Sequence, residues 1–229
     1  MVKLGNDSFD IVNNWLGWGD PKEGLWIIGM EERKVFDEKN VSSRKGQKFA
    51  YETGEKDLNW KVANTTAKLL AIMLNCKDHA TYRDNILWRK GSRVFNGNLL
   101  PLGKPHRNEW PEEVAAQYKE FFEVDCKAYL EAVKKNRYAY FRKFRKEERP
   151  QAIVCFGKGF WPKYTKLFVE HDEQGREYKE YHVTVFEQNQ VILTGHFSYG
   201  RWMPNKSIEF VAEKLTRWGV TPGTLGKEC

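Results

Sequence analysis

Short apolar runs, separated by amphipathic stretches, make up most of this chain. Four runs have the length and residue types of buried strands, and they span 25–29 (LWIIG), 93–98 (RVFNGN), 152–157 (AIVCFG) and 191–195 (VILTG). The stretches between them repeat apolar residues at helical spacing. Strands that alternate with helices are typical of a mostly parallel sheet with helices on both faces. The pattern therefore predicts an α/β fold, a three-layer α/β/α sandwich around a central, mostly parallel four-stranded sheet.

The predicted helices have recognisable ends and faces. A helix over 64–74 has Asn64 as a possible cap, and one over 110–122 has Pro111 in its first turn. The segment 126–146 has an apolar stripe and an opposite basic face, which we interpret as a solvated helix surface rather than a DNA track. The last helix begins after Ser207 and ends at Gly219. The sequence EYHVTVFEQNQVILTG predicts a hairpin, with its turn near 188–189, that leads into the last strand.

Composition narrows the class of protein. The 229 residues fit one domain spanning 1–229, and nine Trp, ten Tyr and fourteen Phe supply a large core. The net charge of +7 favours a polyanionic partner. The longest apolar runs, such as 69–74, are far shorter than the ~20 residues that span a bilayer, so we expect no membrane association and a cytoplasmic or nucleoid-associated protein. The four cysteines are too widely spaced to indicate a zinc site or a disulfide framework, and Cys155 is expected to be inert core.

Polar side chains follow the predicted strands at their carboxyl ends. The sequence GMEER follows the first strand, NGNLLP completes the second, GKGFW follows the third and GHFSYGR follows the last. In a parallel sheet these ends share one edge, where ligands bind. The topology would therefore gather Glu31, Asn98, Lys158 and His196 in one crevice.

These motifs, in this order, resemble those of the uracil-DNA glycosylase superfamily. IIGMEER occupies the place of its first motif, with Glu31 at the position of the catalytic acid or amide. VFNGNLLPL is similar to the base-reading segment of the single-strand-selective monofunctional branch, with Asn98 at the reading position. GHFSYG resembles the final His-Pro-Ser loop, with Phe197 in place of Pro, and RPQAIVCFGKGFW resembles the third-strand segment. The resemblance covers roughly residues 20–220 in order and spacing.

The resemblance implies a monofunctional DNA glycosylase of the same fold, a monomer that acts on DNA without metal or cofactor. Catalysis would fall to His196, donating to the departing base carbonyl, and to Glu31, orienting or deprotonating the attacking water. The resemblance also implies residues that bind the base (Asn98, Arg33 and Met30) and residues that bind the DNA backbone or act as a wedge in base flipping (Gly157, Lys158, Ser198, Tyr199, Arg201 and Trp202).

Two departures from the family pattern concern the target base. Glu32 stands where the family usually has Pro, and Arg33 takes the position of a Tyr that closes the pocket in strict uracil enzymes. Uracil is the family default, and these substitutions favour a pocket for a bulkier modified base. We therefore extend the hypothesis to 5-modified cytosine in viral DNA, as an antiviral defence.

Other functions fit parts of the sequence. One alternative is a nucleic-acid-binding module that kept the fold and lost the chemistry, and another is a hydrolase of free nucleosides or nucleotides on a similar sheet. Lys158 is not part of a P-loop because the required Gly-Lys-Ser/Thr spacing is absent. We interpret the remaining histidines as surface or structural residues (His79, His106, His171 and His182).

Overall fold

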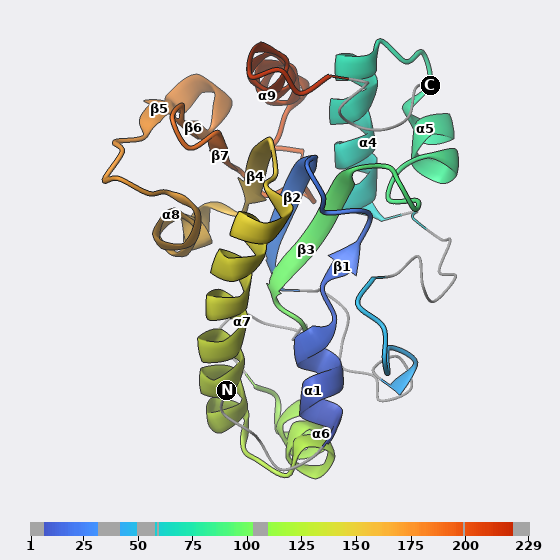
Figure 1. Ribbon diagram of the computed structural model, residues 1–229, viewed down its shortest axis with the longest axis vertical. Coiled ribbons are helices and arrows are strands. Elements are labelled where there is room, and N and C mark those ends of the chain that lie inside the picture. Colours follow the sequence, from blue (N-terminus) through green and yellow to red (C-terminus); the bar gives the residue numbers. More distant parts are fainter. Residues whose placement is uncertain are drawn as a thin grey trace.

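The computed structural model describes residues 7–31, 42–49, 58, 60–102, 110–198 and 200–221, and these form an α/β structure around one sheet (Figure 1). The sheet has seven strands within the described residues, in the order β1-β3-β2-β4-β7-β6-β5. The strands are β1 (Gly17–Trp18), β2 (Leu25–Glu31), β3 (Val94–Leu100), β4 (Ala152–Phe156), β5 (Arg176–Tyr178), β6 (Val183–Phe186) and β7 (Val191–Thr194).

The sheet corrects the predicted strand count. The four apolar runs do form the adjacent strands β3, β2, β4 and β7, and these pair in parallel. However, β1, β6 and β5 pair antiparallel at the two sides, so the sheet is mixed and larger than a four-stranded parallel sheet. The prediction was wrong because β1 has only two residues and β5 is a short, mostly exposed polar segment, and neither leaves an apolar run in the sequence.

Seven α-helices of the described residues cover both faces of this sheet. They are α1 (Asp7–Asn14), α4 (Lys61–Leu74), α5 (His79–Asn85), α6 (Glu112–Phe122), α7 (Cys126–Glu148), α8 (Trp161–Phe168) and α9 (Asn205–Arg217), with two short 3-10 helices, η1 (Lys158–Phe160) and η2 (Lys179–Tyr181). Buried residues of α1, α6, α7 and α8 form one core with one face of the sheet, and those of α4, α5 and α9 form a second core with the other. Figure 1 shows α7 and α8 on one side of the central strands and α4 and α5 on the other.

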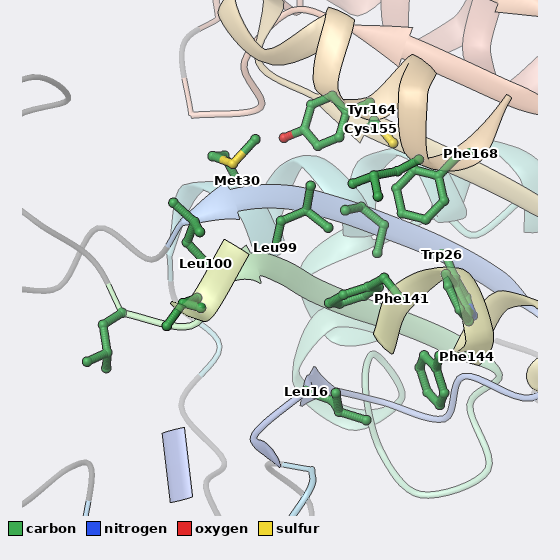
Figure 2. Packing of buried hydrophobic residues seen from close by; sticks show 14 of the residues in the cluster. Leu16, Trp26, Met30, Leu99, Leu100, Phe141, Phe144, Cys155, Tyr164 and Phe168 are labelled. Carbon is green, nitrogen blue, oxygen red and sulfur yellow. The ribbon is translucent and has the colours of Figure 1, made fainter. Parts of the chain in front are cut away.

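The core on the α7 face is rich in aromatic contacts (Figure 2). The ring of Trp26 on β2 stacks on Phe144 of α7 at 5.1 Å between centroids, and its indole nitrogen donates to the carbonyl of Pro21. Cys155 is fully buried in this core, and burial raises the pKa of its thiol, which keeps it protonated and agrees with an inert core residue. Cys126 is also a free thiol, whereas Cys76 is in a disulfide bond that the wide cysteine spacing did not predict.

The helix starts differ from those predicted. The helix α4 begins at Lys61 after Trp60, and Asn64 lies inside it, where its side chain accepts a hydrogen bond from Arg83 instead of capping the helix. Pro111, predicted in the first turn of its helix, stands immediately before α6, and α9 begins at Asn205 after Pro204. These shifts lie within two or three residues, and they do not change the faces that the helices bury.

The predicted hairpin is confirmed as β6 and β7, with Phe186 paired to Val191 across the turn. The carboxylate of Glu173 holds this turn, because it accepts from the backbone N–H groups of Gln188 and Asn189 and from the Asn189 side chain. Although partial burial alone would raise it, these hydrogen bonds bring the pKa of Glu173 below its usual range.

Candidate functional site

The carboxyl ends of β3, β2, β4 and β7 lie along one edge of the sheet, as the parallel pairing requires. The register places Gly29 beside Asn98, and Phe156 beside Thr194. Since Ile28 pairs with Cys155, Gly29 and Phe156 are also neighbours across the β2–β4 pair. Four strands thus supply one row of residues near this edge, and His196 follows two residues after Thr194.

Gly29 lies at the centre of that row because two side chains rest on it. A methyl group at position 29 would lie 2.7 Å from Cζ of Phe156 and closer still to Oδ1 of Asn98. The amide of Asn98 and the ring of Phe156 therefore meet over a backbone that has no side chain of its own. Phe156 belongs to the core on the α4 face, so the meeting point is on that face of the sheet.

A buried arginine on α7 binds the backbone of Asn98. Arg137 of α7 is 1% exposed, and its guanidinium donates to the carbonyls of Asn98 at 2.5 Å and Leu99 at 3.3 Å. It also donates to the carbonyls of Asn13, in the last turn of α1, and of Trp15, between α1 and β1. Arg137 thereby ties the end of β3 to the neighbouring chain, which fixes the position from which the Asn98 amide projects.

An aromatic group connects Asn98 with the loop after β7. The ring of Phe156 stacks on Phe197 at 5.0 Å and meets the ring of His196 edge-on at 5.5 Å. The hydroxyl of Thr65 on α4 donates to the carbonyl of Phe197 at 2.8 Å, which fixes the loop against α4. Phe156 therefore borders the Asn98 amide on one side and the His196 imidazole on the other, and brings two of the predicted residues together.

The hydrogen bonding of His196 indicates which ring nitrogen is protonated in the neutral side chain. The backbone N–H of Ser198 donates to Nδ1 of His196 at 3.1 Å. A nitrogen that accepts a hydrogen bond has no proton of its own, so the neutral imidazole has its proton on Nε2. His196 is only partly buried. In the neutral form of His196, Nε2–H is therefore a hydrogen-bond donor, and the predicted residue Ser198 favours this tautomer through its backbone.

The loop after β4 lies beside the loop that contains His196. Gly157 has a φ of +108°, which a residue with a side chain rarely adopts, and its N–H donates to the carbonyl of Thr194. A methyl group on Gly157 would lie 3.8 Å from Cδ2 of His196, so the two loops touch. Lys158 is exposed, with its ammonium 5.4 Å from the ring of Trp161. Gly157 and Lys158 thus lie beside His196, at the surface.

The loop that follows His196 returns to the end of β7. A side chain on Gly195 would collide with the carbonyl oxygen of Trp202, so these two backbones are in close contact. Arg201 is exposed, with its guanidinium 5.4 Å from the Trp202 ring. Both residues predicted to contact DNA here are therefore at the surface beside His196.

Met30 is the predicted residue that the structure places away from this group. Met30 is 3% exposed and belongs to the core on the opposite face of the sheet, where Figure 2 shows it beside Leu99 and Leu100. Glu31 is the last residue of β2, paired with Leu100, and only its backbone is described. Arg33 and Tyr199 lie outside the described residues. The structure thus places Asn98 and His196 near Phe156, and Gly157 and Ser198 beside His196, with Lys158, Arg201 and Trp202 in the adjoining loops.

The sequence contained signals for two contributors that were missed. Arg137 lies four residues from Val133 and from Phe141, so it falls on the apolar stripe of its helix, where a charged residue indicates a buried role. Phe156 lies in the predicted third strand, but its contact with Asn98 follows from strand register, which sequence periodicity does not provide.

The candidate site combines hydrogen-bonding groups with aromatic side chains. Its described members are an amide, a neutral imidazole, two phenyl rings and backbone groups. Within the described ranges, no three His, Cys, Asp or Glu side chains gather as metal ligands. The imidazole and the amide can bind the edge of a polar ligand that has a carbonyl group, and the buried rings of Phe156 and Phe197 form an apolar backing for these two groups.

Comparison of the chain with protein-family models and with curated proteins gave no match. None of the described helices is both long and apolar enough to cross a membrane.

Proposed function

We propose that this protein is a monofunctional DNA glycosylase with a fold like that of uracil-DNA glycosylases. It would extrude a deaminated or modified pyrimidine base from DNA and hydrolyse the N-glycosidic bond, which leaves an abasic site. Four parallel strands whose ends gather the predicted residues support this proposal. The single observation on which it depends most is the hydrogen bond from the Ser198 N–H to Nδ1 of His196.

That hydrogen bond supports a specific catalytic role for His196. When the glycosidic bond breaks, the sugar becomes oxocarbenium-like and the bonding electrons leave with the base as an anion. A neutral imidazole with its proton on Nε2 can donate to the base carbonyl oxygen, where the negative charge develops. Because the loop already fixes this tautomer, no rearrangement is needed during the reaction, which is the condition for effective electrostatic stabilisation.

Asn98 would select the base, beside buried aromatic rings. An amide has both a donor and an acceptor, so it can pair with one pyrimidine edge and reject another. Phe156 and Phe197 provide the apolar surroundings in which such hydrogen bonds discriminate best. The lack of a side chain at Gly29 allows the amide and the Phe156 ring to meet.

The remaining roles fall to other residues at the same edge of the sheet. Glu31, at the end of β2, would orient or deprotonate the attacking water, which adds to the sugar as the base leaves. The backbone at Gly157 and Ser198, with the ammonium of Lys158, would hold phosphates beside the flipped nucleotide. These groups add no redox chemistry, and water is the only co-reactant.

The direct test is base release from defined oligonucleotides. The full chain would be incubated with strands containing uracil, a thymine mismatch or a 5-modified cytosine, and alkali-labile sites would be measured. We expect cleavage of at least one substrate, and His196→Ala should lower the rate by about 100- to 1,000-fold. The exposed α7 residue Lys135 provides a control, and Lys135→Ala should keep the wild-type rate.

Two outcomes would contradict the proposal. No alkali-labile site in any substrate, with DNA binding retained, would favour a binding module without chemistry. Base release from mononucleotides but not from oligonucleotides would favour a hydrolase of free nucleosides.

A further inference from the structure

A second aromatic group lies beside the His196 loop, on the side away from Asn98. The rings of Trp202 and His182 meet edge-on, with centroids 5.7 Å apart. The guanidinium of Arg201 lies 5.4 Å from the centre of the same Trp202 ring. We call the group formed by Trp202, His182 and Arg201 the platform. His182, interpreted from sequence as a surface or structural residue, is thus a direct neighbour of the loop.

The antiparallel hairpin explains why the platform adjoins the candidate site. Because β6 runs opposite to β7, it begins at the edge where β7 ends, and Val183 pairs with Thr194. His182 therefore precedes β6 at the same edge from which His196 projects. The loop returns Trp202 to the backbone of Gly195, next to both. The platform thus occupies the same edge as the Asn98–His196 group, one strand further along.

The exposure of Trp202 leaves part of its indole open to a ligand. An exposed aromatic ring with adjacent basic groups is a typical surface for stacking the bases of single-stranded nucleic acid. The Trp202 side chain is 39% exposed, and among the described residues only Ile72 is a comparably exposed large apolar side chain. Ile72 lies on α4, without an aromatic or arginine partner of this kind. Arg201 is exposed as well, so the platform combines an open indole with a positive charge.

We propose that the platform stacks an unpaired base adjacent to the one held at Asn98 and His196, so that the preferred ligand is single-stranded DNA. This inference rests on the proposed function for the choice of DNA. In a single strand every base has a face free to stack on an indole, whereas in a duplex neighbouring base pairs cover those faces. Contact with His182 and Gly195 fixes Trp202 at the surface before the ligand arrives, which lowers the entropy cost of binding. Arg201 would neutralise the phosphate of the stacked nucleotide.

The test is equilibrium binding, which does not require cleavage. Fluorescence anisotropy would measure the Kd of a labelled single-stranded DNA of roughly 12 nucleotides containing uracil, with His196→Ala as the parent protein to prevent turnover. Adding Trp202→Ala should raise this Kd about 5- to 100-fold, whereas Trp202→Phe should recover most of the affinity. Arg201→Ala should reduce the salt dependence of binding by about one phosphate contact. Ile72→Ala is the matched control for loss of an exposed apolar side chain, and should bind like the parent.

The outcomes separate this inference from the proposed function. An unchanged Kd for Trp202→Ala, in a variant with parental thermal stability, would overturn the platform whatever the cleavage assay shows. Tighter binding of the matching duplex, or of an RNA strand of the same sequence, would overturn the preference for single-stranded DNA. Binding that depends on Trp202, together with no base release from any substrate, would reject the glycosylase and leave the platform standing.

Discussion

Gly29 sets a steric limit at the centre of the candidate site, and Gly29→Ala should therefore destabilise the protein. At an unobstructed strand position Ala is better than Gly by about 0.5–1 kcal/mol, because Gly loses more backbone freedom on folding. At position 29 the new methyl group would lie 2.7 Å from Cζ of Phe156 and closer still to Oδ1 of Asn98. Real Cβ atoms essentially never come so close, so one of these side chains must move. Overpacking of this kind costs about 1–3 kcal/mol, which exceeds the gain from Ala.

The expected net loss is roughly 0.5–2 kcal/mol in the free energy of unfolding. For a protein of this size the loss corresponds to a fall in Tm of roughly 1–8 °C, measurable by circular dichroism. If Asn98 is the group that moves, base release should fall by about 100-fold, since a displacement near 1 Å has that effect on a positioned group. The two measurements together show whether the clash affects the fold, the site or both.

Gly200→Ala is the matched control. A methyl group on Gly200 would meet no atom within 4 Å, so its Tm should stay at the wild-type value or rise slightly. If Gly29→Ala were as stable as wild type and kept its full activity, the contact of Asn98 and Phe156 over Gly29 would be wrong, and the described site with it.

Three further substitutions test other parts of the structure. Gly157→Ala should cost about 1–3 kcal/mol in thermal unfolding, because its φ of +108° strains any residue with a side chain, and an equally stable variant would contradict the loop conformation. Arg137→Met removes a buried guanidinium that donates to four backbone carbonyls, so the free energy of unfolding in urea should fall by about 3–5 kcal/mol; a loss below 1 kcal/mol would show that these bonds contribute little. Although partial burial would raise the pKa of Glu187, hydrogen bonds from Lys214 and Trp218 lower it. Its folded pKa is thus below its unfolded one, so its stabilisation is present at neutral pH and is lost as the pH falls through the folded pKa. Between neutral pH and about pH 3, Glu187→Gln should therefore lose less stability than wild type, and equal acid sensitivity would contradict the role of these bonds.

Apolar periodicity predicted the central strands well and the edges of the sheet poorly. Buried strands such as 25–29 and 191–195 can be recognised in the sequence as continuous apolar runs, because both faces of those strands are covered. An edge strand needs no such run, and β5 is held by pairing with β6 rather than by burial. The sequence therefore predicted the four parallel strands at the centre of the sheet, but too few of the antiparallel strands at its sides.

The site was predictable to the level of strand ends and not to the level of contacts. Asn98 and His196 were placed at one edge by topology, and the structure shows both against Phe156. Met30 was expected to bind the base, but strand alternation turns it to the other face, because it is adjacent to Gly29 along the strand. His182 was overlooked because its importance depends on a loop returning to it, which no local pattern encodes.

The turn between β6 and β7 also affects the pairing register of the two strands. Glu173 clamps Gln188 and Asn189, and this clamp sets which residue of β6 faces which residue of β7. Side chains alternate along a strand, so a slip by one position would point His182 away from Trp202 and expose the buried residues of β6. Substitutions at Glu173, at the turn of the hairpin, would in this way change the contact of His182 with Trp202 at its opposite end.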